Sequence, residues 1–212
     1  MGRDLTDRPV RRRAVAGAAD AILDAAERVF GKRGYHAASV REIAAQAGVS
    51  KAAVFHHFPT KAALYRAVLE RACEELATVL EGEEARDPVQ AIARYQQAEM
   101  ALMRRRAALA RLVLRAMADG DEETGRAIVA EVFGRFFARM RALAERAQQE
   151  RKLAAWVAPE LVALVPAMVN SFFFLSYPAL SRVDEKAFPP EGIEEKAVCM
   201  CALILEGWKE GR

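Results

Sequence analysis

The chain has 212 residues, which is enough for one sizeable hydrophobic core or two small ones. Hydrophobic residues make up 53% of the sequence and charged residues 29%, a balance that excludes a disordered chain and favours a folded one. The net charge is only +3, but residues 1–66 carry 12 Lys and Arg against 6 Asp and Glu, whereas the remainder is slightly acidic. This basic N-terminal third predicts a polyanionic partner, with chance clustering of charge as the alternative.

The cysteines and the N-terminal residues indicate the cellular compartment in which the protein is expected. Three cysteines (Cys73, Cys199 and Cys201) are too few for a disulfide framework and fit a reducing environment, so we expect a cytoplasmic protein. Cys199 and Cys201 lie two residues apart and therefore point to different faces of a helix, which predicts small core residues rather than metal ligands. The polar N-terminus leads into Arg11–Arg13 without the apolar segment of a signal peptide.

The N-terminal segment predicts a basic arm followed by a helix. Residues 1–17 are expected to form a flexible basic arm. Apolar residues at helical spacing predict a helix that begins near Asp20 and ends at Gly31 and Gly34.

Two short helices are expected next. Ser39 is followed three residues later by Glu42, the pattern of a capping box, and the helix that it opens stops at Gly48. Ser50 then caps a helix over residues 51–57. Gly48 can adopt the positive φ that a tight turn between these helices needs. The spacing is that of a helix-turn-helix, whose second helix has a face free to enter the DNA major groove.

The remainder of the chain is predicted to be helical as well, with no strand pattern and no internal repeat. The expected helices cover residues 88–104, 106–118, 121–150, 159–178 and 192–208. Within them, Leu161–Ser181 carries no charge and is long enough to span a bilayer. Pro166, Asn170 and Pro178 interrupt this stretch, which favours a buried helix over a membrane span, so no membrane partner is expected.

The segment SVREIAAQAGVSKAAVFHHFPTKAALYRAVL resembles the N-terminal DNA-binding domain of the TetR family of bacterial regulators, most strongly over residues 20–70. The resemblance implies an all-α fold. An N-terminal three-helix helix-turn-helix DNA-binding domain would cover residues 18–66, and a helical-bundle effector-binding and dimerisation domain residues 67–212.

The resemblance also implies which residues contact DNA. Lys51 would donate to a guanine edge or a phosphate, and Arg41 to a base edge or the backbone. Phe55 occupies a position where the family often has Tyr, so the hydroxyl contact to a phosphate is missing here. The predicted DNA-binding residues are Arg41, Ser50, Lys51, Ala52, Ala53, Phe55, His56, His57 and Lys61. Ordinary solvated charges are the alternative for Arg41 and Lys51, and adjacent His56 and His57 diverge too far on a helix to share a metal.

For the C-terminal body, the resemblance implies a small-molecule effector and a homodimer. Met and Phe side chains at helical spacing are candidates for the effector pocket, although such residues more often form the core. The candidates are Met100, Met103, Met117, Phe133, Phe137, Phe172 and Phe174. No buried acid or base stands out as a residue that would recognise a charge on the ligand, so the effector is expected to be apolar or aromatic. The predicted dimer interface is Val165, Val169, Phe173, Ile193, Ala197, Met200, Ile204 and Trp208, with packing inside one chain as the alternative.

Together these patterns predict a sequence-specific transcriptional regulator, a repressor that an effector releases from a palindromic double-stranded DNA operator. The sequence shows no nucleophile–base pair, phosphate-binding glycine loop or metal cluster. We therefore expect no enzymatic activity, no catalytic residues, no cofactor and no metal. A helical enzyme or a membrane-associated protein is the alternative.

Overall fold

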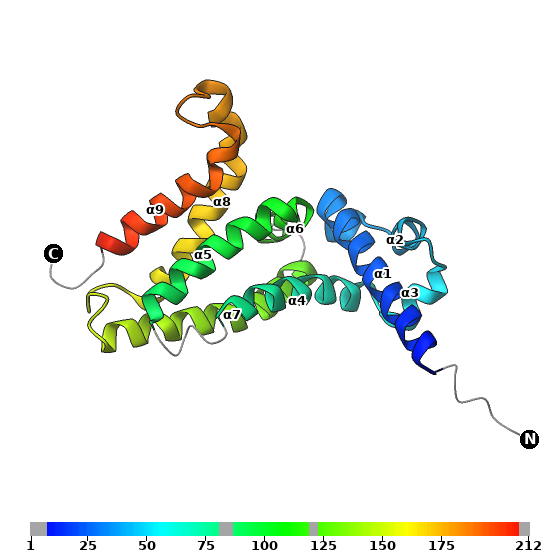
Figure 1. Cartoon of the computed structure of the whole chain (residues 1–212). Helices are drawn as coiled ribbons and strands as arrows, with labels where there is room; N and C mark the ends of the chain where they lie inside the picture. The colour runs from blue at the N-terminus through cyan, green and yellow to red at the C-terminus, as the bar shows by residue number, and fades with distance from the viewer. Residues whose placement is uncertain (1–7, 81–86, 119–122, 208–212) are drawn as a thin grey trace, which may run out of the picture. The chain divides into compact units, whose positions relative to one another are not determined.

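The computed structural model describes residues 8–80, 87–118 and 123–207, and all regular elements in these ranges are helical (Figure 1). The predicted all-α fold is therefore confirmed. The elements are α1 (Arg8–Ala37), α2 (Val40–Ala47), α3 (Lys51–His57), α4 (Lys61–Leu80), α5 (Pro88–Arg105), α6 (Ala107–Ala118), α7 (Glu123–Gln149), α8 (Pro159–Val183), the short 3₁₀ helix η1 (Pro190–Gly192) and α9 (Ile193–Gly207).

The chain divides into two compact units, each described by itself. The N-terminal unit contains the residues up to Arg71 together with residues 108–130, and the C-terminal unit contains residues 72–107 and 131–212. The sequence placed a single boundary near residue 66. It gave no indication that residues 108–130 group with the first four helices, because that grouping depends on contacts between segments far apart in the sequence.

Helix α1 differs from the prediction at both ends. It begins at Arg8, so residues 8–17 are helical rather than a loose arm, and residues 1–7 lie outside the described residues. Pro9 stands in the first turn, where its missing N–H costs no hydrogen bond, and no other proline follows before the helix ends. The helix also continues through Gly31. Its regular geometry breaks only at Gly34, where φ is 77° and ψ is 174°.

The core of the N-terminal unit is built around three aromatic rings. Tyr65 of α4 lies edge-on to Phe30 and Tyr35, with ring centroids 5.0 and 4.9 Å apart. Such edge-to-face pairs add directional attraction to the burial of apolar area. Next to this core, Arg71 forms ion pairs with exposed Asp24 at 2.8 Å and with buried Glu27 at 3.3 Å. These contacts join α1 to α4, and the two helices together support α2 and α3.

The core of the C-terminal unit forms where α5, α8 and α9 pack against one another. Helix α8 is long and apolar enough to cross a membrane by length and composition alone. One of its faces, however, is buried against α5 and α9 through residues such as Val169 and Tyr177. Helix α8 also runs past the expected end at Pro178 to Val183, since Tyr177 is anchored in the core and keeps the last turns in place. Of the two neighbouring cysteines predicted to be core residues, Cys201 is buried and Cys199 is exposed.

A buried polar cluster joins α5 to α8 inside this unit. The Asn170 amide accepts from Gln96 Nε2 at 2.9 Å and donates to the Gln96 carbonyl at 3.0 Å and to Glu99 Oε2 at 2.8 Å. Burial raises the pKa of Glu99 to about 7, and hydrogen bonds from Asn170 and Tyr95 offset part of that increase. The sequence pattern did not single out Glu99, whose carboxyl the fold places beside Asn170 and Tyr95.

Candidate nucleic-acid interface

The interface begins where Ser39 opens α2. Ser39 Oγ accepts a hydrogen bond from the Arg41 backbone N–H at 3.2 Å, which satisfies one of the free donors at the helix start. The reciprocal half of the predicted capping box is replaced, because the Glu42 carboxylate forms an ion pair with Arg33 of α1 at 2.8 Å. This pair ties α2 to α1 and leaves Arg41 exposed.

The turn between α2 and α3 depends on Gly48. This residue has φ 69° and ψ 27°, as the sequence predicted, and its N–H and that of Val49 bond back to carbonyls of the last turn of α2. Residues other than glycine rarely adopt this left-handed backbone conformation. Gly48 therefore sets the angle at which α3 leaves the scaffold.

A substitution at Gly48 tests this role. A Cβ at Gly48 would meet no atom within 4 Å, so the cost of Gly48→Ala comes from backbone strain rather than from a clash. We expect a loss of about 1 kcal/mol in the free energy of unfolding, measured by chemical denaturation, and a smaller loss for Gly48→Asn. Equal stability of the alanine variant and the wild type would contradict the account of the turn.

Helix α3 is fixed at its start and on one face. Ser50 Oγ accepts from the Ala53 N–H at 3.0 Å, which caps the helix as predicted. Val54 is buried, whereas Lys51 is exposed and its ammonium lies 5.5 Å from the centre of the Phe55 ring. This cation–π contact holds the long lysine side chain along the exposed face of the helix.

Lys61 makes two contacts within the chain that the sequence did not indicate. Its Nζ donates to the His36 carbonyl at 2.9 Å and lies 4.7 Å from the centre of the Tyr35 ring. Sequence spacing alone could not reveal these partners, which lie 25 and 26 residues earlier in the chain. An ammonium has three N–H donors, so Lys61 can hold the end of α1 and still donate to a phosphate.

The nine predicted DNA-binding residues all lie on α2, α3 and the first turn of α4, together with the turns that join them. Arg41, Ser50, Lys51, Ala52, Phe55 and His56 are exposed, and Ala53, His57 and Lys61 are half-buried. The rings of His56 and His57 lie edge to face, and no group that could hold a metal ion is found among the described residues. The groups that this surface presents to a binding partner are methyl groups and a few cationic hydrogen-bond donors.

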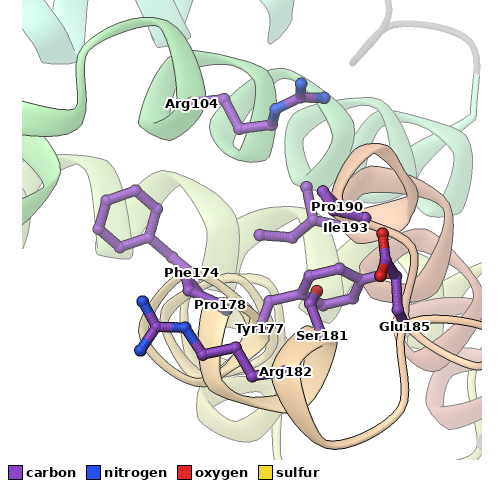
Figure 2. Close-up of a pocket in the computed structure, with 9 residues that line it drawn as sticks. All are labelled: Arg104, Phe174, Tyr177, Pro178, Ser181, Arg182, Glu185, Pro190 and Ile193. Carbon is purple, nitrogen blue, oxygen red and sulfur yellow. The ribbon is translucent and has the colours of Figure 1, made fainter.

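The predicted effector residues do not gather around one cavity. Phe174 lines a cleft of about 700 Å³ in the C-terminal unit (Figure 2). Met100 lines a smaller cleft of about 420 Å³. Phe172 is 60% exposed and faces away from the core. The remaining candidates are the half-buried Met103, Phe133 and Phe137, and Met117, whose side chain lies outside the described residues.

The structure also reassigns most of the predicted dimer residues. It buries five of them within one chain: Val165, Val169, Phe173, Ile193 and Ala197. Met200 is exposed, Ile204 is half-buried and Trp208 lies outside the described residues. The exposed apolar row on α8 and α9 consists instead of Leu161, Leu164, Met168, Phe172, Leu175, Met200 and Leu203. Both faces of α8 are apolar, so periodicity could not tell which of them meets α5.

The comparisons with known proteins agree with this geometry. Residues 22–68 match the family model described as bacterial regulatory proteins, tetR family. The HTH-type transcriptional activator FasR of Mycolicibacterium smegmatis is 51% identical over 57 residues, which are 27% of this chain and 26% of FasR. The HTH-type transcriptional repressor Rv1474c of Mycobacterium tuberculosis is 43% identical over 58 residues, 27% of this chain and 31% of that protein.

Solved structures extend the likeness of fold to nearly the whole chain. The fatty acid degradation regulator FadR of Bacillus halodurans aligns with a TM-score of 0.72 over 90% of this chain and 99% of its own, at 16% identity. FadR of Bacillus subtilis, solved with stearoyl-CoA, gives 0.68 at 17% identity, over 91% and 98%. The sequence matches span less than a third of the two curated relatives, so they bear on the helix-turn-helix. Residues 22–68 therefore form a DNA-binding domain of the tetR family of bacterial regulatory proteins, and the solved structures show that the chain shares their all-helical fold.

Proposed function

We propose that the protein is a sequence-specific DNA-binding regulator that reads its operator with α3. The observation that carries this proposal is the position of Lys51, Ala52 and Phe55. They are exposed on a capped helix whose opposite face is fixed by buried Val54, inside the segment that matches the family model. A rigid helix with one free face fits the width of the major groove. Its target would be chromosomal DNA, which places the protein in the cytoplasm.

The side chains of α3 determine how the operator would be read. Lys51 is the donor on this helix for a guanine edge, while Ala52 and Ala53 can contact thymine methyl groups. Arg41, His56 and Lys61 would hold the phosphate backbone. With so few hydrogen-bonding groups, part of the specificity would come from the shape and deformability of the DNA.

Selection of bound DNA from a random pool tests the proposal. The expected product is an inverted repeat whose half-sites lie about one helical turn apart, with binding that weakens as salt rises. Recovery of unrelated sequences, or binding that is equal for all DNA, would contradict it.

The proposed operator symmetry needs a dimer, and the exposed apolar row of α8 and α9 fits a second copy of the chain. Leu161, Leu164, Met168, Phe172 and Leu175 repeat at intervals of three and four residues, which aligns them along one face of α8. A two-fold interface uses the same surface on both subunits, and a continuous apolar row satisfies that requirement. Exposed rows of this kind are rare on monomers.

Phe172→Glu tests the dimer. Phe172 is 60% exposed in the single chain, so a carboxylate there should leave the fold intact but would be buried without a partner in the dimer. We expect sedimentation equilibrium to show a monomer for this variant and a dimer for the wild type. Trp156→Glu, an exposed aromatic residue ahead of α8, serves as the control and should remain dimeric.

We further propose that a small molecule bound in the C-terminal unit releases the protein from DNA, so that it acts as a repressor and not as an enzyme. The ligand would favour a conformer whose reading helices no longer match the operator. In support, a structural neighbour, FadR of Bacillus subtilis, was solved in complex with stearoyl-CoA. An apolar or aromatic effector remains the expectation from the sequence. Transcription from the selected operator should rise when the gene is deleted, and a fall would indicate an activator.

A further inference from the structure

The cleft of about 700 Å³ lies beside the C-terminal half of α8, with Arg104 of α5 across from it and the η1 segment at one end (Figure 2). Its volume is within the usual range for small-molecule sites. The lining consists of Arg104, Phe174, Tyr177, Pro178, Ser181, Arg182, Glu185, Pro190 and Ile193. Apolar and polar side chains are therefore both present.

Two hydroxyl groups in the lining lack partners. Tyr177 is only 2% exposed, and neither its Oη nor Ser181 Oγ has a hydrogen-bond partner among the described residues. The two residues are four apart and therefore share one face of α8. Buried polar groups without partners are costly and rare in native proteins. Both residues line the cleft and both oxygens are buried, so a ligand that packs against this face of α8 can supply the missing hydrogen-bond partners once the side chains turn toward it.

The surroundings of Tyr177 favour a hydroxyl that donates. Burial and the nearby carboxylates of Glu191 and Glu195 raise the pKa of Tyr177, which keeps its proton in place. Gly192 is buried beside this group, and a Cβ there would lie 2.7 Å from the Tyr177 hydroxyl oxygen. The absence of a side chain at Gly192 thus leaves the hydroxyl room to meet a ligand.

The remaining polar groups make the lining rich in donors. Arg104 and Arg182 each contribute a guanidinium to the lining, which also contains the carboxylate of Glu185, while the carboxylates of Glu191 and Glu195 lie near Tyr177. Arg104 also pairs with Glu194 at 3.0 Å, but 43% of its side chain stays exposed, so donors remain free for a ligand. Phe174, Pro178 and Ile193 supply apolar surface in the same cleft.

We propose that this cleft binds an amphipathic carboxylate. The carboxylate accepts hydrogen bonds from the Tyr177 and Ser181 hydroxyls and is neutralised by Arg104 and Arg182, and the hydrocarbon part packs on Phe174, Pro178 and Ile193. This inference rests on the proposed function, since it names the chemical class of the effector. It narrows the expected apolar or aromatic effector to one with an anionic head group.

The test uses three probes of one chain length, octanoate, octanol and octylammonium, titrated calorimetrically into the full-length protein without DNA. Octanoate should bind more tightly than the other two probes. Tyr177→Phe and Ser181→Ala should each weaken octanoate binding by about tenfold, the usual effect of losing one hydrogen bond to a charged group. Removal of an unpartnered hydroxyl leaves the folded protein intact, as thermal unfolding of the free variants will verify.

Matched substitutions elsewhere serve as controls. Ser176→Ala removes a hydroxyl of α8 that bonds to the Phe172 carbonyl, and Tyr65→Phe removes one in the N-terminal unit. Both should bind octanoate as the wild type does. Three results would overturn the inference: no octanoate binding, equal binding by all variants, or tighter binding of octylammonium. Operator binding by the ligand-free protein is measured in parallel. A protein that binds its operator but not octanoate would contradict the proposed ligand and leave the DNA-binding function intact.

Discussion

Gly31→Ala is expected to destabilise the N-terminal unit by about 3 kcal/mol, at the upper end for an added methyl group in a packed core. A Cβ at Gly31 would lie 2.2 Å from the Ala108 carbonyl oxygen and 2.8 Å from its carbon. These are backbone atoms of α6, which cannot rotate away as a side chain can. Relief of this clash would require α1 and α6 to separate, and the contacts between the two helices would be lost.

Gly17→Ala provides the matched control on the same helix. Gly17 is exposed and a Cβ there meets nothing within 4 Å, so alanine should stabilise the protein by up to about 1 kcal/mol through helix propensity. Chemical denaturation of both variants measures the two effects, which have opposite signs. A Gly31→Ala variant as stable as the wild type would mean that α1 and α6 are not in close contact.

The second large effect depends on pH and comes from Glu99. Its pKa is raised from an ordinary value of 4.5 to about 7 in the folded chain, because the carboxyl is buried beside Tyr95 and Asn170. Between these two values the unfolded chain has released the proton and the folded chain still holds it. Stability therefore falls as pH rises from 4.5 to 7 and is constant above, a loss on the order of 3 kcal/mol.

Glu99→Gln removes this titration while keeping an oxygen that can accept from Asn170. We expect the stability of the variant relative to the wild type to rise by about 2.5 kcal/mol between pH 5 and pH 8, as measured by urea denaturation at both pH values. The control is Glu145→Gln on α7, where an exposed carboxylate pairs with Arg141 at 3.4 Å. Parallel pH profiles for Glu99→Gln and the wild type would show that Glu99 ionises normally.

Local features were predictable from the sequence. Ser50 caps α3, and Gly48 takes the left-handed conformation, because both depend on neighbours within a few residues. Gly31 shows where this reasoning fails. The sequence predicts a helix end at Gly31, yet this residue lies inside α1 and leaves space for the backbone of Ala108, 77 residues later. Close approach between distant helices leaves no periodic signal in either of them.

The packing of the C-terminal unit could not be predicted from the sequence, for a related reason. Both faces of α8 are apolar, so the buried face and the exposed row could not be separated without knowing where α5 and α9 pack. The polar cluster of Gln96, Glu99 and Asn170 joins residues more than 70 positions apart. Gln96 and Glu99 are three apart and share a helix face, which was a weak signal for a buried polar site.

Operator binding by Lys51→Ala tests the central claim most directly, with the selected operator and single-base variants of it compared by gel shift. The account predicts that the variant loses about 1–3 kcal/mol of discrimination at one base pair of each half-site, while residual binding stays salt-dependent. Lys186→Ala, an exposed lysine of the C-terminal unit, should behave as the wild type. Unchanged base preference and affinity in Lys51→Ala would contradict the assignment of α3 as the reading helix.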